Sequence, residues 1–118
     1  HFMETLRQQT QIIPALIYTS DHGESLGEGG VFLHSAPLSI APPEQTTVPN
    51  FLCLSQPYIQ TFGVNMTCLQ QKAAAAISSV AAGAGTTSHD NFFPTALGLL
   101  DIQTTERKPE LDLTAGCL

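Results

Sequence analysis

Four residues near the start of the chain have side chains suited to binding a metal ion. Asp21 and His22 are adjacent, Glu24 follows closely, and His34 comes after a glycine-rich segment. Carboxylate oxygen and imidazole nitrogen together suit zinc, manganese or iron. Asp21, His22 and His34 are therefore candidate metal ligands, and Glu24 is a candidate ligand or supporting contact. Three ligands do not complete a site, so a further ligand and any nucleophile must come from elsewhere.

The same residues would also fit an ordinary turn without a metal, in which an aspartate lies beside a solvent-exposed histidine. What favours a site is the local context. The apolar run Ala15–Thr19 predicts a strand buried on both faces of a parallel sheet, and it ends directly before Ser20. Sites in open α/β sheets lie at the carboxyl ends of such strands. Gly23 permits a backbone conformation that other residues resist, and the turn at 27–30 lets His34 fold back.

The helices and strands around this segment are predicted from residue propensities and from the positions of proline and glycine. Residues 4–11 favour a surface helix that Pro14 breaks. Residues 48–54 predict a second strand, with Pro49 tolerated only near its start. The alanine-rich stretch 73–87 could begin as a helix but contains two glycines, and we interpret it as an insertion or linker.

The C-terminal third predicts one helix and an exposed tail. Ser88 or Asp90 can cap the helix, and Pro94 fits only in its first turn. Its expected apolar face consists of Phe92, Phe93, Ala96, Leu97 and Leu100. Residues 104–118 contain several charged side chains and are expected to be exposed.

Composition excludes several classes of protein. The chain has 118 residues, 42% of them hydrophobic and 12% charged, which fits one modest globular domain. Its formal net charge of -6 argues against nucleic-acid binding. The longest apolar runs are far shorter than the roughly 20 residues that span a bilayer, and the first residues do not form a signal peptide.

The three cysteines do not form a zinc or redox motif, because Cys53, Cys68 and Cys117 are widely spaced. In an oxidising compartment two of them could pair, and in a reducing one all three would be small hydrophobes. Composition leaves both alternatives open.

Longer motifs resemble a known family. The stretch from Tyr18 to His34, continued by residues 40–49, is similar to the lipid A phosphoethanolamine transferases, which include the mobile colistin-resistance proteins. Segments 88–93, 97–104 and 109–113 resemble the end of the same catalytic domain. The resemblance omits only residues 73–87. It implies an α/β fold, alkaline-phosphatase-like, with a mainly parallel sheet and flanking helices, of which residues 1–118 form a C-terminal portion.

The resemblance also implies roles for individual residues. Asp21 and His22 correspond to ligands of a tightly held zinc. His34 corresponds to a histidine that serves a second zinc or the phosphate group of the substrate, and Glu24 to an acidic position beside the metals. The nucleophile of the family is a threonine, which we expect outside this chain, so that the chain alone is inactive. His89 is expected to cap and pack rather than to bind metal.

The implied reaction moves phosphoethanolamine from phosphatidylethanolamine to lipid A or a related lipopolysaccharide acceptor. Such an enzyme is anchored in the bacterial inner membrane by N-terminal helices outside this chain, with its catalytic domain in the periplasm. In that oxidising compartment Cys68 and Cys117, which lie in segments similar to the family, could form a bridge, and the pairing of the three cysteines stays open. The resemblance also implies that activity of such an enzyme is associated with polymyxin resistance.

Three features depart from the family pattern. Ser35 stands where glycine is usual, Pro94 stands where a helix-compatible residue is usual, and residues 73–87 exceed the usual connection. Two alternatives therefore remain beside the transferase. One is a sulfatase or phosphoglycerol transferase of the same superfamily, and the other is a non-catalytic remnant of such a domain.

Overall fold

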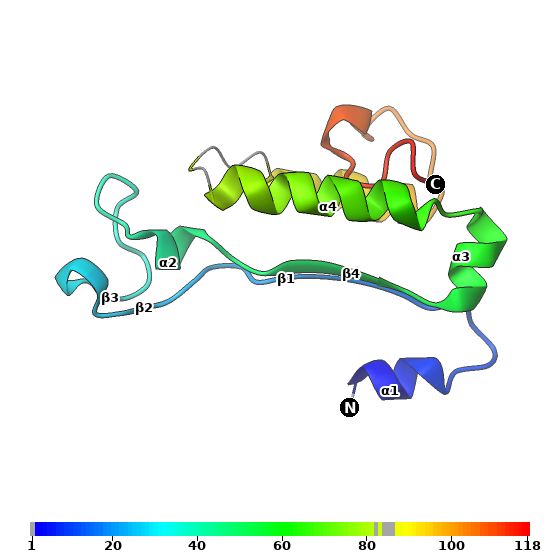
Figure 1. Cartoon of the computed structure of the whole chain (residues 1–118), viewed down its shortest axis with the longest axis horizontal. Helices are drawn as coiled ribbons and strands as arrows, with labels where there is room; N and C mark the ends of the chain where they lie inside the picture. The colour runs from blue at the N-terminus through cyan, green and yellow to red at the C-terminus, as the bar shows by residue number, and fades with distance from the viewer. Residues whose placement is uncertain (1, 82, 84–86) are drawn as a thin grey trace. The chain divides into compact units, whose positions relative to one another are not determined.

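The structure is a computed structural model that describes residues 2–81, 83 and 87–118. The chain divides into two compact units, one formed by the residues up to Leu16 together with Cys53–Leu118, the other by Ile17–Leu52. The described helices and strands follow one another along the chain as Figure 1 shows. They are α1 (Phe2–Arg7), β1 (Ala15–Thr19), β2 (Ser25–Leu26), η1 (Glu28–Gly30), β3 (Phe32–Leu33), α2 (Pro43–Thr46), β4 (Asn50–Leu54), α3 (Gln56–Phe62), α4 (Met66–Ala81), η2 (His89–Asn91), α5 (Phe92–Leu99) and η3 (Pro109–Leu111).

The predicted strands at 15–19 and 48–54 are confirmed as β1 and β4, which pair with each other (Figure 1). The backbone N–H of Ser20 donates to Pro49 O, and that of Ser55 donates to Pro14 O, so the pair runs antiparallel. Pro49 precedes the strand, where its missing N–H costs nothing to the ladder.

The expectation that residues 15–19 form a strand buried on both faces of a parallel sheet is wrong, since β1 is partly exposed and pairs antiparallel with β4. Tyr18 is 43% exposed and stacks on Phe51, which is 47% exposed. The reason is that the described strands form two sheets of only two strands each. A two-stranded sheet leaves its faces open unless other elements cover them.

The second sheet is a short hairpin that folds the glycine-rich segment back, as predicted. Ser25 pairs with Leu33 and Leu26 pairs with Phe32, antiparallel. The turn between them contains η1, in which Gly29 has a φ of 59°. Glycine adopts this left-handed conformation without the steric penalty of a Cβ atom.

Two helices, α1 and α4, differ in length from the predictions. α1 ends at Arg7, short of the expected Gln11. Residues 73–81 continue α4, which ends before Gly83, and residues 82 and 84–86 lie outside the described part of the chain. That 73–87 is an insertion or linker remains a prediction.

The helix expected after Ser88 is present as η2 followed by α5. The Ser88 hydroxyl accepts from Asp90 N, and the Asn91 side chain accepts from Ser88 N, which completes a capping box. Pro94 lies in the first turn of α5, as predicted. Ser88 is therefore the capping residue.

The apolar face predicted for this helix is wrong. Phe93 and Leu100 are 57% and 67% exposed, whereas Thr95, Gly98 and Leu99 are buried. The buried face of α5 is the one against which the C-terminal segment packs: the Asp112 carboxylate lies where a Cβ on Gly98 would be. Gly98, which has no Cβ, thus allows the tail to approach this face of α5 closely.

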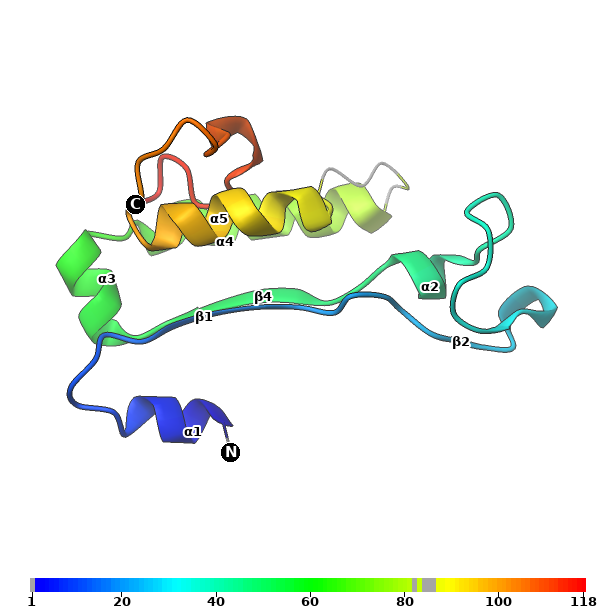
Figure 2. The same cartoon turned by 180° about the vertical axis from the view of Figure 1, so that it is seen from behind.

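The prediction that residues 104–118 are exposed is wrong for three residues in the second half of that segment. Asp112, Thr114 and Cys117 are at most 4% exposed. Side chains of the preceding helices hold the tail, since Thr95 Oγ1 accepts from Leu113 N and Asn91 Nδ2 donates to Leu111 O. Figure 2 shows this C-terminal segment folding back toward α5.

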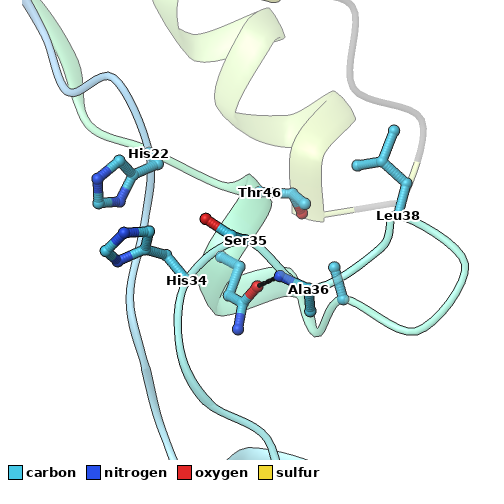
Figure 3. Close-up of a pocket in the computed structure, with 8 residues that line it drawn as sticks. His22, His34, Ser35, Ala36, Leu38 and Thr46 are labelled. Carbon is cyan, nitrogen blue, oxygen red and sulfur yellow. Dashed lines mark hydrogen bonds between the residues drawn. The ribbon is translucent and has the colours of Figure 1, made fainter.

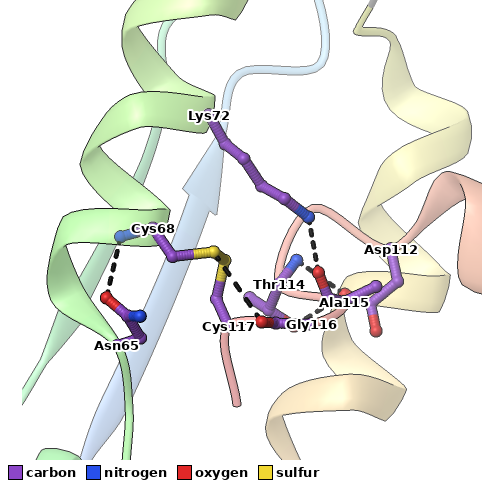
Figure 4. The surroundings of a disulfide bond; sticks show 8 residues. All are labelled: Asn65, Cys68, Lys72, Asp112, Thr114, Ala115, Gly116 and Cys117. Atoms are coloured by element: carbon purple, nitrogen blue, oxygen red, sulfur yellow. Dashed lines mark hydrogen bonds between the residues drawn. A yellow bond between two sulfur atoms is a disulfide. The ribbon is translucent and has the colours of Figure 1, made fainter.

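A disulfide joins Cys68 of α4 to Cys117, with a Cα–Cα distance of 5.6 Å, and decides the pairing that the sequence left open (Figure 4). Beside it, Lys72 Nζ donates to Ala115 O over 2.6 Å. Cys53 remains a free, half-buried thiol. The tail is thus fixed by a covalent bond as well as by hydrogen bonds.

Candidate metal centre

The candidate ligands lie in the unit Ile17–Leu52, in loops on both sides of the β2–β3 hairpin. Asp21 and His22 follow β1 directly, as predicted. The turn is local: Ser20 Oγ donates to His22 O, and His22 N donates to Asp21 Oδ1 over 3.1 Å. Such side-chain bonds to neighbouring backbone stabilise a turn in place of a continuing strand.

Gly23 is required here for close approach rather than for an unusual φ. A Cβ at this position would collide with the backbone carbonyl of Glu44. The Gly23 N–H donates to Gln45 O over 3.0 Å. The loop after β1 is therefore held against α2.

The hairpin register brings His34 to Glu24. Ser25 pairs with Leu33, so the next positions outward on the two chains are Glu24 and His34. Their side chains meet, with His34 Nδ1 3.1 Å from Glu24 Oε2. Both side chains are less than half exposed, at 45% and 44%.

His34 also reaches His22, and Figure 3 shows the two rings facing each other. Their centroids are 4.1 Å apart and their planes differ by 27°. The structure therefore brings these two predicted residues to one place.

Hydrogen bonds fix the tautomer of both imidazoles. His22 Nδ1 lies 2.8 Å from Gly23 O, and a carbonyl can only accept, so this nitrogen carries the proton. His34 Nδ1 donates in the same way to the Glu24 carboxylate. In the neutral rings Nε2 keeps its lone pair, which is the form that binds metals.

Among the described residues, the group that offers ligand atoms close enough to share one ion consists of His22, Glu24 and His34, whose atoms all lie within 4.8 Å of one another. Asp21 is not brought into that group: its side chain is 89% exposed, and its Oδ2 lies 3.9 Å from His22 Nε2. Imidazole nitrogen and carboxylate oxygen are ordinary zinc ligands that bind at about 2.0–2.2 Å, so the side chains of His22, Glu24 and His34 suit this ion chemically.

A pocket of about 220 Å³ adjoins the histidines (Figure 3). Small and polar side chains form much of its wall, and Ser35 lies beside the histidines. The lining residues are His22, His34, Ser35, Ala36, Leu38, Ala41, Gln45 and Thr46.

Gln45, which was not among the predicted site residues, is 7% exposed and contacts both loops of the site. A buried glutamine needs hydrogen-bond partners, but its partners cannot be deduced from the sequence. His89, which was expected to cap and pack, lies exposed in η2, and the capping residue there is Ser88.

No described helix has the combination of length and apolar character needed to cross a membrane.

Comparison with known proteins supports both the fold and the family. Residues 1–102 match the Sulfatase family. Phosphoethanolamine transferase EptA of Salmonella typhimurium is 42% identical over 109 residues, which are 92% of this chain and 18% of that protein. The chain thus spans less than a fifth of the length of this curated relative.

Solved structures agree with this match. The soluble domain of lipooligosaccharide phosphoethanolamine transferase A from Neisseria meningitidis superposes with a TM-score of 0.80 at 36% identity, over 98% of this chain and 32% of that one. The C-terminal periplasmic domain of phosphoethanolamine transferase EptC from Campylobacter jejuni gives a TM-score of 0.72 at 32% identity, over 99% of this chain and 33% of that one. The predicted α/β, alkaline-phosphatase-like fold is confirmed.

Proposed function

The chain belongs to the sulfatase family, and from this premise we propose that it is the C-terminal portion of the catalytic domain of a zinc-dependent phosphoethanolamine transferase. The relatives named above are phosphoethanolamine transferases. The proposed donor is phosphatidylethanolamine, and the proposed acceptor is lipid A or a related lipopolysaccharide.

The stacked His22 and His34 pair carries this proposal. Each ring donates from Nδ1 and presents an unprotonated Nε2 in its neutral form. We assign Asp21, His22 and His34 as metal ligands, with Glu24 orienting His34. This assignment uses the Glu24 carboxylate as hydrogen-bond acceptor, a common partner of a metal-binding histidine.

Bound zinc would supply Lewis-acid stabilisation of charge on a phosphoryl group. The residues of this chain would provide the charge and the orientation of the ligands. Asp21 contributes negative charge at the ligand cluster, while Gly23 O and Glu24 hold the two imidazoles in the binding tautomer. The threonine nucleophile is proposed to lie outside this chain.

Metal binding by purified chain tests the assignment. Titration with Co²⁺, which gives visible absorption bands when bound, should show one ion per chain, and Zn²⁺ should displace it. His22→Ala and His34→Ala should each weaken binding by at least about tenfold, and Asp21→Ala should weaken it as well. His89→Ala, in the other unit, is the matched control. Binding that survives both histidine substitutions would refute the site.

A second test concerns the missing nucleophile. The chain alone should transfer nothing from a fluorescent phosphatidylethanolamine donor, because no covalent intermediate can form without the nucleophile. Mass spectrometry of the chain after incubation checks this directly. A phosphoethanolamine adduct on any of its threonines would overturn the placement.

Location can be tested in the protein that contains this chain. We propose that this domain is periplasmic and is attached to the inner membrane through segments outside the chain. Alkaline phosphatase fused after Leu118 should therefore be active, since it needs an oxidising compartment. An inactive alkaline phosphatase fusion together with a fluorescent cytoplasmic reporter fusion would contradict both location and substrate.

A further inference from the structure

Gln45 has a buried side chain in the unit that holds the candidate ligands. It lies in α2, a helix of four residues, and is 7% exposed. Burial of a carboxamide is unfavourable unless its polar atoms find partners. Here both ends of the carboxamide are bonded to the main chain.

The partners of Gln45 bracket His34. Its Oε1 accepts from Ala36 N over 3.1 Å, and its Nε2 donates to Leu33 O over 2.9 Å. One side chain thus grips the backbone before and after His34. The path of the chain through His34 is set by these two bonds.

The backbone carbonyl of Gln45 bonds to the loop that contains His22. Gln45 O accepts from Gly23 N over 3.0 Å, directly after His22. Gly23 O is in turn the acceptor for His22 Nδ1, so Gln45 bonds to the residue whose carbonyl orients this ring. A single residue therefore connects the supports of both histidines.

The loop around His34 needs such support. Leu33 and Ser35 have φ values of 64° and 73°, in the left-handed region that non-glycine residues avoid. Each such residue costs on the order of 1 kcal/mol and persists only where its surroundings enforce it. The bonds of Gln45 to Leu33 O and Ala36 N help to hold Leu33 and Ser35 in this conformation.

We propose that Gln45 is a positioning residue that sets the stacking distance between His22 and His34 and thereby the metal affinity of the site. The histidine geometry is a property of this chain alone, and only the metal part rests on the proposed function. Gln45 does not bind the metal itself in this proposal. It acts through the two loops that it joins.

Two substitutions separate its two side-chain bonds. Gln45→Met keeps the length of the side chain and removes both bonds. Gln45→Glu keeps an acceptor for Ala36 N but loses the donor to Leu33 O and places a carboxylate beside that carbonyl. Gln70→Met, at an exposed position of α4, is the matched control.

The first measurement is made without metal. Nuclear Overhauser contacts between the ring protons of His22 and His34 should be present in the unaltered chain and in Gln70→Met. They should be lost in Gln45→Met and weakened in Gln45→Glu. Circular dichroism identifies a variant that has unfolded, in which case the milder Gln45→Glu decides.

The second measurement is Co²⁺ affinity, which should fall about tenfold in Gln45→Met, the lower end of what partners behind metal ligands contribute. Retained ring contacts and unchanged Co²⁺ affinity in both Gln45 variants would overturn the proposal. Ring contacts that depend on Gln45 in a chain that binds no Co²⁺ would support the positioning role and contradict metal binding by the residues of this chain alone.

Discussion

The imidazole rings of His22 and His34 stack with their centroids 4.1 Å apart, although the two residues are twelve positions apart in the sequence. The β2–β3 hairpin closes most of this separation, and α2 holds both of its flanks. The contact is therefore a product of loop geometry. Changes in the loops should alter it as strongly as changes in the rings.

Ser35→Gly should stabilise the chain by about 0.5–1 kcal/mol. Ser35 has a φ of 73°, which glycine adopts without strain, while the added freedom of the unfolded chain offsets part of the gain. Urea denaturation measures the change in the free energy of unfolding. Ser35→Ala is the control, because it removes the hydroxyl and keeps the Cβ. Equal stability of the alanine and glycine variants would show that backbone strain is absent.

Breaking the Cys68–Cys117 bridge should destabilise the chain by about 2–4 kcal/mol. The bridge closes a loop with a sequence separation of 49, and its loss restores that loop's freedom in the unfolded state. Cys117→Ser compared with the unaltered chain by thermal unfolding gives the value. Cys53→Ser, which affects only the free thiol, serves as control. A reducing agent should lower the melting temperature of the Cys53→Ser chain but not that of Cys117→Ser.

Arg107→Met should cost about 3 kcal/mol of stability. Arg107 Nη2 donates to Asp112 Oδ2 over 2.7 Å, and the Asp112 side chain is fully buried. Removing the guanidinium leaves a buried carboxylate without its countercharge, which is more costly than losing both partners. Lys108→Met, at an exposed neighbouring position, should have little effect. If the two variants unfold at the same urea concentration, the ion pair contributes nothing.

Stability should decline above pH 10 through Tyr58. Burial raises the pKa of Tyr58 above its usual value of 10.0, and the charge of Asp101 raises it further. The folded state therefore keeps the phenol proton at pH values where the unfolded state loses it, so the free energy of unfolding falls as pH rises through this range. Ultraviolet titration of a Tyr18→Phe chain, which leaves Tyr58 as the single tyrosine, measures the pKa.

The control for this titration is Asp101→Asn, which should bring the pKa of Tyr58 part of the way back. Tyr58→Phe should abolish the alkaline loss of stability. It should also cost about 1–2 kcal/mol at neutral pH, because Leu99 O, which accepts from the Tyr58 hydroxyl, would lose its buried partner. A Tyr58 that titrates alike in the folded and urea-unfolded chains would contradict this account.

Local sequence was sufficient for the elements whose signals lie within a few residues. The strands at 15–19 and 48–54, the turn at 27–30 and the Ser88 cap follow from propensity, glycine and capping chemistry, and the structure contains each of them. Motif similarity supplied the family and the fold class. These predictions succeed because they depend on short-range physical preferences or on long ungapped motifs.

Only the tertiary structure decided which faces are buried and which side chains meet. The apolar pattern of α5 pointed to Phe93 and Leu100, yet the tail packs against Thr95 and Gly98 instead. In the same way, Glu24, His34 and Gln45 carry no local signal that they share a hydrogen-bond network.

Asp21, His22, Glu24 and His34 could thus be named from the sequence as chemistry-bearing residues, whereas their geometry could not. The stacking of the two histidines depends on hairpin register, on two residues with positive φ, and on the bonds of Gln45. Each is a long-range or strained feature, whose stability comes from contacts between segments rather than from the preferences of any one segment. The sequence by itself determined the chemical types available, and the packing of loops decided which of them act together.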